Sequence, residues 1–320
     1  MLPSGCRHES NGRQNGRTNE LWTGQRAMKY LLTHANNIRF AYYTVGSGPR
    51  LLLLLHGFPD DAATMLPLME RLDHERFTLV APNLRGYAPS SAPIDGRYSL
   101  EVLAQDVIAM IDAMGFTTAS VVGHDWGALA AYSAAQLDPS RIDKLCAISV
   151  PPPRVFLRNL TKNPQQLSRS AYIFFFQLPL LPERLLASEN YGLIEQLWSR
   201  WSPEWRWRDA RHAKVLSTFM QEDTPASALG YYRALLRDML FDPSSWRRSC
   251  SLAMRRLTCP SLILHGKQDG CIGPEMYRRI DFGFTPRTPY RVVPLENCGH
   301  FPQQEKVDEV AHQLSMFLGA

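Results

Sequence analysis

The fold of this 320-residue chain can be read from the stretch Val121-Val-Gly-His-Asp-Trp-Gly-Ala128. The two valines indicate the end of a buried strand, and the residues that follow indicate the start of a helix. Three small residues, Gly123, Gly127 and Ala128, leave room for a tight turn between the two elements. Such a turn lifts the side chain at its apex, Asp125, above the edge of a sheet, where it can act as a nucleophile. An aspartate after a strand can also cap the following helix, so both interpretations of Asp125 stay open on this stretch alone.

The segments around this turn alternate between strand-like and helix-like patterns. Leu51–Leu55 is a run of five leucines that ends at glycine, as expected of a central strand covered on both faces. Further strands are predicted at 29–34, 38–45, 77–81, 119–122, 145–150, 261–266 and 290–294, and helices at 100–115, 129–137 and 307–318. This alternation predicts the α/β class, with a mostly parallel sheet and helices on both of its faces.

The alternation is interrupted once. From Pro151-Pro-Pro153 to about Cys250 the chain is rich in Trp, Phe, Leu and Arg and shows helical patterns without strands. Residues near the N-terminus are rich in Gly, Asn and Arg, with little apolar surface to bury. We therefore predict a disordered leader (1–27), a first part of the α/β core (28–150), an inserted helical cap (151–252) and a second part of the core (253–320).

Composition and charge exclude several classes of protein. The net charge of +5, from 35 Lys and Arg against 30 Asp and Glu, is too weak to predict a nucleic-acid partner. No apolar run approaches the roughly 18 residues that span a membrane. The N-terminal residues have no apolar segment behind their basic residues, so we expect no secretory signal peptide. The six cysteines have no metal-binding spacing, so we expect reduced thiols, no metal and a cytoplasmic location.

A second motif follows the leucine strand. In Leu55-His-Gly-Phe-Pro59, a turn can aim the backbone N–H of Phe58 at the point that the N–H of Trp126 also faces. Two convergent backbone donors of this kind form an oxyanion hole, which stabilises negative charge on a reacting oxygen. Taken alone, the motif could belong to any connection between a strand and a helix.

Two more candidate residues follow predicted strands near the C-terminus. Asp269 lies just after the strand at 261–266, and His300 lies after the strand at 290–294. Together with Asp125 they give the chain order nucleophile, acid and histidine, each placed after a strand. This is the order and placement of the catalytic triad in α/β hydrolases, so the three residues are predicted to meet.

With these motifs in place, the chain from Met28 to Leu318 resembles the α/β-hydrolase fold and, within it, the epoxide hydrolases. Members of that family carry two tyrosines on the cap. The matching segments here are Tyr172-Ile-Phe-Phe-Phe and Gly230-Tyr-Tyr-Arg. The resemblance implies that Tyr172 and Tyr232 protonate the oxygen of an opening epoxide, with Tyr231 the less favoured partner.

The resemblance also implies a reaction and a substrate class. Ionised Asp125 would attack an epoxide carbon and form an ester, and His300, oriented by Asp269, would activate the water that releases a vicinal diol. No cofactor is implied, the partner is a small hydrophobic epoxide, and a homodimer is left open. The residues expected to contact the substrate are Phe58, Trp126 and Phe176, with a wider apolar lining from Phe174, Phe175, Leu178 and Leu180.

Haloalkane dehalogenases are the main alternative, because they also use an aspartate at this turn. Trp126 could supply one donor to a departing halide. The second donor that is common in those enzymes, an Asn after His-Gly, is Phe58 here. Some dehalogenases also take their acid from the segment that corresponds to residues 145–160, which contains no Asp or Glu in this chain. Both differences favour the epoxide hydrolase.

A non-catalytic binding protein is the minor alternative. The stretch from Trp198 to Arg211 contains four Trp and four Arg, a composition that is compatible with an RNA-binding or membrane-surface patch. However, Ser202-Pro-Glu204 has the pattern of a helix cap and a first helical turn. We therefore expect two helices that meet at Pro203, with the tryptophans packed inward and the arginines facing water.

Overall fold

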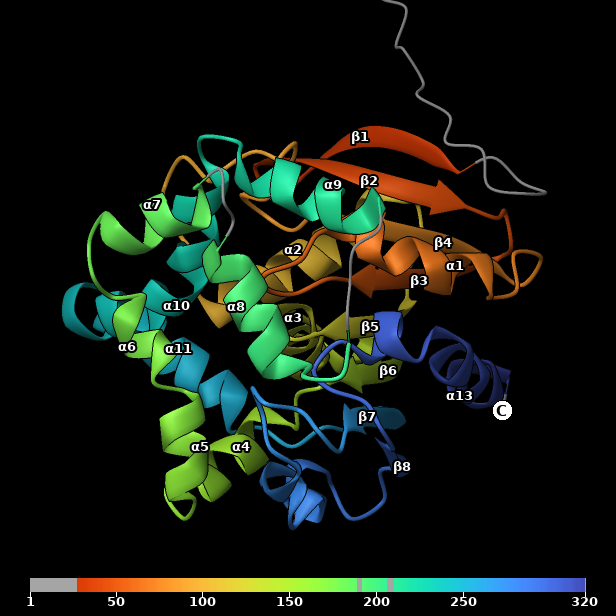
Figure 1. Cartoon of the computed structure of the whole chain (residues 1–320). Helices are drawn as coiled ribbons and strands as arrows, with labels where there is room; N and C mark the ends of the chain where they lie inside the picture. Colours follow the sequence, from red (N-terminus) through yellow and green to blue (C-terminus); the bar gives the residue numbers. More distant parts are fainter. Residues whose placement is uncertain (1–27, 189–191, 206–209, 320) are drawn as a thin grey trace, which may run out of the picture.

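A computed structural model of the chain describes residues 28–188, 192–205 and 210–319 (Figure 1). The predicted leader at 1–27 lies outside the described residues. The described chain forms an eight-stranded sheet in the order β1-β2-β4-β3-β5-β6-β7-β8. The strands are β1 (Lys29–Ala35), β2 (Ile38–Val45), β3 (Arg50–Leu55), β4 (Phe77–Pro82), β5 (Ala119–His124), β6 (Ile142–Ile148), β7 (Ser261–Gly266) and β8 (Tyr290–Leu295).

Strand direction confirms the predicted α/β class. All neighbouring pairs from β4 to β8 are parallel, whereas β1 pairs with β2, and β2 with β4, in antiparallel fashion. The antiparallel edge arises from the hairpin that turns at Asn36 and Asn37, both of which have positive φ. Parallel strands place their carboxyl ends at one edge of the sheet, which is where an active site of this fold class can form.

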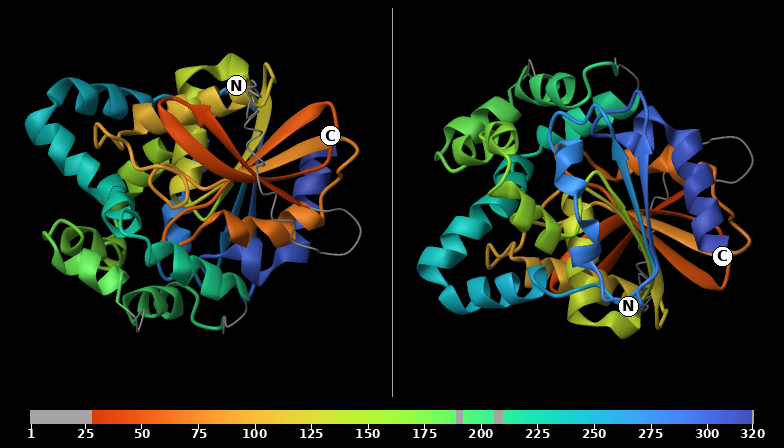
Figure 2. Two further views of the ribbon diagram at one scale, coloured as in Figure 1. Left: turned by 90° about the horizontal axis from the view of Figure 1, so that it is seen from above. Right: turned by 90° about the horizontal axis from the view of Figure 1, so that it is seen from below.

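Helices cover both faces of the sheet, and the leucine strand shows how. Leu51, Leu53 and Leu55 belong to one buried cluster, and Leu52 and Leu54 belong to the other, because alternate side chains of a strand point to opposite faces. The first cluster includes α2 (Leu100–Ala113) and α3 (Trp126–Leu137), and the second includes α1 (Leu66–Glu70) and α13 (Val307–Gly319). Figure 2 shows α13, in dark blue, across the sheet from the green and cyan helices.

The green and cyan helices form the insert, which we define as residues 149–260, between β6 and β7. Where the structure describes it, the insert consists mainly of helices and the loops between them, as the change in composition predicts. Its helices are α4 (Pro153–Leu160), α5 (Pro164–Arg169), α6 (Tyr172–Phe175), α7 (Leu181–Leu186), α8 (Gly192–Trp201), α9 (Ala210–Phe219), α10 (Thr224–Phe241) and α11 (Pro243–Ala253). They gather on one side of the sheet in Figure 1.

The prediction that Ser202-Pro-Glu204 begins a helix is wrong. Helix α8 ends at Trp201, the next residues form a turn, and α9 begins at Ala210, with 206–209 outside the described residues. The Ser202 hydroxyl does not cap a helix, because it donates to Glu305 Oε1 (2.6 Å) and accepts the backbone N–H of His300 (2.8 Å). The expected inward packing is confirmed for Trp198 and Trp201, which are both buried.

Candidate active site

Asp125 occupies the turn between β5 and α3 in a strained conformation, with φ of 50° and ψ of −115°. A residue other than glycine rarely adopts a positive φ, and such strain is concentrated at functional sites. The Asp125 side chain makes no capping hydrogen bond to α3, so the capping interpretation is wrong. Glycines permit the turn: a methyl group on Gly123 would lie 2.3 Å from the Gly127 carbonyl oxygen, and one on Gly127 would lie 2.3 Å from the Leu55 carbonyl oxygen.

The replacement Gly127→Ala should therefore destabilise the protein. The added methyl group would meet backbone rather than a movable side chain, so β3, α3 or the turn must shift. We expect the free energy of unfolding to fall by at least about 2 kcal/mol, the range typical of overpacked sites. Chemical denaturation measures the change. The matched control is Gly192→Ala at the start of α8, where a methyl group would meet nothing within 4 Å. Equal stability of the two variants would contradict the proposed constraint.

The three predicted triad residues meet at the carboxyl edge of the sheet. His300 Nδ1 lies 2.8 Å from Asp269 Oδ2, within hydrogen-bonding distance. On the other side of the ring, His300 Nε2 lies 3.6 Å from Asp125 Oδ2, close enough for an ion pair but not for a direct hydrogen bond. Asp269 is itself held in place, because its Oδ1 accepts the backbone N–H groups of Cys271 (2.7 Å) and Ile272 (2.9 Å).

The charges of this cluster depend on one another. Burial disfavours a charged imidazole, but the carboxylates of Asp269 and Asp125 outweigh it and raise the pKa of His300 to about 10. Burial likewise opposes ionisation of Asp125, yet the imidazolium of His300 keeps the pKa of this carboxyl below its usual value. The resting site therefore holds an ionised Asp125 beside a protonated His300 at neutral pH.

The predicted backbone donor from the leucine-strand loop also reaches the site. The N–H of Phe58 donates to Asp125 Oδ1 at 2.9 Å. Gly57 allows this close approach, because a Cβ at that position would lie 2.4 Å from the Asp125 Cβ. The second predicted donor belongs to Trp126, the first residue of α3, so its N–H is one of those without a partner inside the helix.

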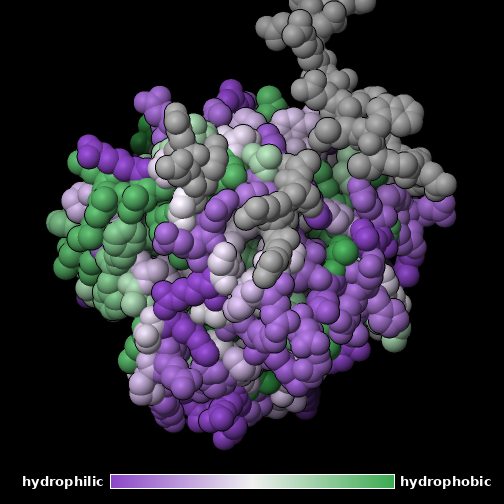
Figure 3. All heavy atoms as spheres, in the orientation of Figure 1, coloured by the Kyte–Doolittle hydropathy of each residue, from purple (hydrophilic) through white to green (hydrophobic). Residues whose placement is uncertain are grey.

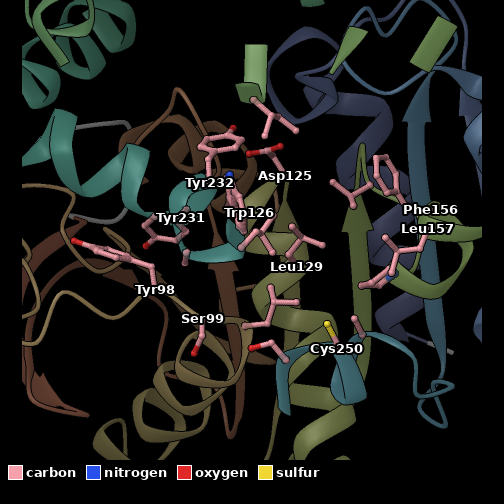
Figure 4. Close-up of a pocket in the computed structure, with 18 of the residues that line it drawn as sticks. Tyr98, Ser99, Asp125, Trp126, Leu129, Phe156, Leu157, Tyr231, Tyr232 and Cys250 are labelled. Carbon is pink, nitrogen blue, oxygen red and sulfur yellow. The ribbon is translucent and has the colours of Figure 1, made fainter. Parts of the chain in front are cut away.

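A cavity of about 580 Å³ opens on Asp125, and its lining includes both predicted tyrosines, Tyr172 and Tyr232. Figure 4 shows Asp125 and Tyr232 at one end of this cavity. The rings of Tyr172 and Tyr232 lie 5.8 Å apart, and Tyr232 packs edge-on against Trp126 at 5.0 Å. Burial raises the pKa of both tyrosines well above its usual value, so both hydroxyls stay protonated. The Tyr172 hydroxyl lies 3.6 Å from the Cys271 sulfur.

The adjacent Tyr231 also lines the cavity, but its hydroxyl is already used. It donates to the carbonyl oxygen of Arg85 at 2.9 Å. The Tyr232 hydroxyl, by contrast, is buried and has no hydrogen-bond partner among the described residues. Tyr232 is therefore the tyrosine of this pair whose proton is free for a bound substrate.

Other predicted contact residues lie outside the lining. Phe58 and Phe176 are fully buried and pack edge-on against each other (5.4 Å) and against Tyr232 (5.3 and 5.1 Å), so they support the tyrosine from behind. The expected apolar lining from Phe174, Phe175, Leu178 and Leu180 is wrong, because none of these residues lines the cavity. Phe174, Leu178 and Leu180 are instead 77%, 47% and 64% exposed. They lie in the insert, on whose outer face hydrophobic atoms gather in Figure 3.

Sequence reasoning missed most of the actual lining. Besides the proposed catalytic residues, the cavity is lined from α4 by Phe156 and Leu157, by Tyr98 and Ser99 just before α2, and by residues of α10 and α11. The helical spacing of α10 and α11 could have grouped the residues of each inner face, but no sequence signal shows that these faces enclose a cavity. Within the described ranges, no cluster of His, Cys, Asp or Glu could hold a metal ion, and no helix is long and apolar enough to cross a membrane.

Comparisons with known proteins agree with this geometry. A sequence model described as the alpha/beta hydrolase fold matches residues 50–307. Human epoxide hydrolase 4 is 28% identical over 301 residues, which cover 90% of this chain and 78% of that protein. The AB hydrolase superfamily protein YfhM of Bacillus subtilis is 31% identical over 236 residues, which cover 73% of this chain and 78% of that protein.

Solved structures point the same way. An epoxide hydrolase of Bacillus megaterium, solved in complex with an inhibitor, superposes with a TM-score of 0.76 at 27% identity, covering 91% of this chain and 100% of that one. Epoxide Hydrolase A from Mycobacterium thermoresistibile gives a TM-score of 0.78 at 26% identity, covering 92% of this chain and 98% of that one. The chain therefore belongs to the α/β-hydrolase fold family, and it resembles members of that family that are epoxide hydrolases.

Proposed function

We propose that this protein is an epoxide hydrolase that works through a covalent ester on Asp125. The observation that carries the proposal is the arrangement around one cavity. An ionised aspartate at the strained turn and two protonated tyrosines line the cavity, and a histidine lies beside the aspartate outside the lining. The names of the relatives support the same activity. In this proposal the helices of the insert act as a cap that supplies the tyrosines.

The first step opens the epoxide ring. An Asp125 oxygen attacks one epoxide carbon, and the bond between that carbon and the epoxide oxygen breaks. The departing oxygen takes a proton from Tyr232 or Tyr172, whose hydroxyls hold it during attack. The product is a hydroxyalkyl ester of Asp125. A high tyrosine pKa suits this role, because the proton is retained until the strongly basic alkoxide develops.

The second step hydrolyses the ester. His300 Nε2 takes a proton from water, and the hydroxide attacks the carbonyl carbon of the Asp125 ester. The negative charge that develops on the carbonyl oxygen is stabilised by the N–H groups of Phe58 and Trp126, at roughly 3–4 kcal/mol per donor. The bond between the carbonyl carbon and the alkyl oxygen then breaks. The departing alkoxide takes the proton of the new Asp125 carboxyl group, so the diol leaves and Asp125 regains its carboxylate with one oxygen from water. The proton that His300 gives up once the ester has formed returns to the tyrosinate left by the first step, so the cycle ends with an ionised Asp125, a protonated His300 and neutral tyrosines.

The charges of the resting site predict how the two steps respond to pH. Ester formation removes one of the two carboxylates that raise the pKa of His300. The histidine pKa must then fall, which frees Nε2 to act as a base. Below that lowered pKa the imidazole keeps its proton and hydrolysis slows, whereas Asp125, with its depressed pKa, stays ionised and is still alkylated.

We therefore expect the ester to accumulate as the pH is lowered from about 8 to about 5, with hydrolysis slowing by up to about tenfold per pH unit. Acid quenching during turnover, followed by intact-protein mass spectrometry, measures the esterified fraction. A fraction that falls with decreasing pH would show that alkylation, not His300, is the acid-sensitive step.

The activity itself is tested with styrene oxide, with the diol measured by chromatography. Diol formation is expected, and 1-bromobutane should release no bromide at a comparable rate. A dehalogenase would give the opposite result, because a halide departs as a stable anion and needs no tyrosine proton. If the folded protein forms neither the diol nor bromide, both the epoxide hydrolase and the dehalogenase assignments are contradicted.

A further inference from the structure

The cavity extends well beyond the residues of the proposed reaction. It is lined along two helices by residues spaced three or four apart, which places each set on one helix face. These are Tyr231, Ala234, Leu235 and Asp238 on α10, and Trp246, Ser249, Cys250 and Ala253 on α11. Asp238 lies six residues beyond Tyr232, which corresponds to about 9 Å along the helix axis. In Figure 4, Cys250 likewise lies at the opposite end of the pocket from Asp125 and Tyr232.

The cavity opens to solvent between three helices. Its lining includes Leu157 of α4, Leu235 of α10 and Trp246 of α11, which are also 47%, 48% and 36% exposed. Lining residues that are also exposed mark the mouth of the cavity. Their apolar side chains favour entry of an apolar substrate.

The charged groups of the lining are all acidic. Among the lining residues of the described chain, Asp125 and Asp238 are the carboxylates, and none is Lys, Arg or His. The nearest cation on the helix, Arg237, is already engaged: Nη2 donates to Asp238 Oδ1 at 2.9 Å and Nη1 donates to the Gly96 carbonyl oxygen. A carboxylate brought into the cavity would therefore lie beside the Asp238 carboxylate, whose cation Arg237 is already paired with it, and would find no free cation among the lining residues.

The end of the cavity between α10 and α11 also holds polar groups that can form further hydrogen bonds. Asp238 is buried, and its Oδ2 accepts one hydrogen bond, from the Ser245 hydroxyl at 3.2 Å, although a carboxylate oxygen can accept a second. One helical turn beyond Ser245, Ser249 is only 8% exposed, and its hydroxyl has no hydrogen-bond partner among the described residues. A buried hydroxyl without a partner is costly, so a polar group of a bound molecule is its natural complement.

We propose that Asp238 and Ser249 form a polar subsite that binds a hydroxyl group remote from the epoxide ring. This assignment rests on the proposed epoxide hydrolase function and adds the class of substrate. The substrate is then a neutral, apolar epoxide with a hydroxyl group at its far end, and a carboxylate at that position is rejected. The subsite would favour a hydroxyl group by a hydrogen bond and disfavour a carboxylate, whose charge would be buried without a partner.

Three matched ten-carbon substrates test the assignment: 9,10-epoxydecan-1-ol, 1,2-epoxydecane and 9,10-epoxydecanoic acid. The far end of the chain carries a hydroxyl, a methyl or a carboxylate group in turn. We expect the kcat/KM of the alcohol to exceed that of the alkane by about tenfold, the effect of one well-placed hydrogen bond. The acid should be at least about 100-fold poorer than the alcohol, because an unpaired buried charge costs more than a lost hydrogen bond.

Two variants assign the preference to the subsite. Ser249→Ala should bring the alcohol-to-alkane ratio of kcat/KM close to one. Cys250→Ala, a truncation at the neighbouring position of the same lining, should leave that ratio as in the wild type. Asp238→Asn should raise the kcat/KM of the acid relative to that of the alcohol, because the substitution removes the negative charge of Asp238. Since Asp238 also links α10 to α11, that variant is first checked by thermal unfolding, and Ser249→Ala carries the test if it is unfolded.

Equal kcat/KM values for alcohol and alkane, or an unchanged ratio in Ser249→Ala, would overturn the subsite while leaving the proposed activity intact. A kcat/KM for the acid equal to that for the alcohol would overturn the proposed discrimination against a carboxylate. Failure of the activity is a different outcome: the wild type would then form no diol from any of these epoxides or from styrene oxide.

Discussion

In the His300→Gln variant, the ester on Asp125 is expected to accumulate instead of being released as diol. Alkylation needs the aspartate and the tyrosine protons, whereas hydrolysis needs the base that His300 supplies. Steady-state turnover should fall by about 10²–10⁴-fold, the usual contribution of a general base. Intact-protein mass spectrometry should show the mass of one substrate added, and peptide mapping should place it on the peptide that contains Asp125.

Asp125→Asn provides the matched control, because it should gain no mass at early times under the same conditions. The His300→Gln variant must also be shown to be folded. It removes the imidazolium between two buried carboxylates, although Asp269 keeps its two backbone hydrogen bonds. A folded variant that is inactive and never gains mass would refute the proposed division of labour between Asp125 and His300.

The triad could be predicted because its signals are local. Asp125, Asp269 and His300 each follow a short apolar strand, and parallel strands bring their carboxyl ends to one edge whatever the length of chain between them. The short distance from His300 to Asp269, 31 residues away in sequence, follows from β7 and β8 being neighbours. The order and pairing of the strands were therefore enough to predict that these three residues meet, without any detail of side-chain packing.

The ends of elements were less predictable, for identifiable reasons. The predicted helix at 129–137 begins at Trp126, because the turn at Asp125 leads into it directly. The predicted strand at 145–150 runs over Ile142–Ile148: polar residues conceal its start, and Ser149 ends it with a φ of 62°. The one-turn helices α1 and α12 (Pro302–Glu305) are too short to show a helical period.

The lining of the cavity could not be predicted because it depends on how short helices pack. The run Tyr172–Phe176 is apolar throughout, so its composition does not separate the side that faces the cavity from the side that faces solvent. In the structure Tyr172 lines the cavity, Phe176 lies behind it and Phe174 is exposed. The resemblance to epoxide hydrolases predicted a role for Tyr172 and Tyr232 that periodicity alone did not suggest, and both residues line the cavity.

The tyrosines provide the second test with a large expected effect. Epoxide opening creates an alkoxide that must be protonated, so Tyr172→Phe and Tyr232→Phe should each slow alkylation by about 10²-fold. If the two hydroxyls contribute independently, their effects multiply, and the double variant should be slower by about 10⁴-fold. Rapid-quench measurement of ester formation isolates this step from hydrolysis.

Tyr231→Phe is the matched control, because it removes the same atom from the neighbouring residue. Its hydroxyl donates to the Arg85 carbonyl oxygen, so its loss should lower the free energy of unfolding by about 1 kcal/mol and have far less effect on alkylation. The comparison separates proton donation from the packing of aromatic rings, which all three substitutions preserve. If the double variant opens epoxides at the rate of Tyr231→Phe, the proton must come from elsewhere, and the assignment of both tyrosines is wrong.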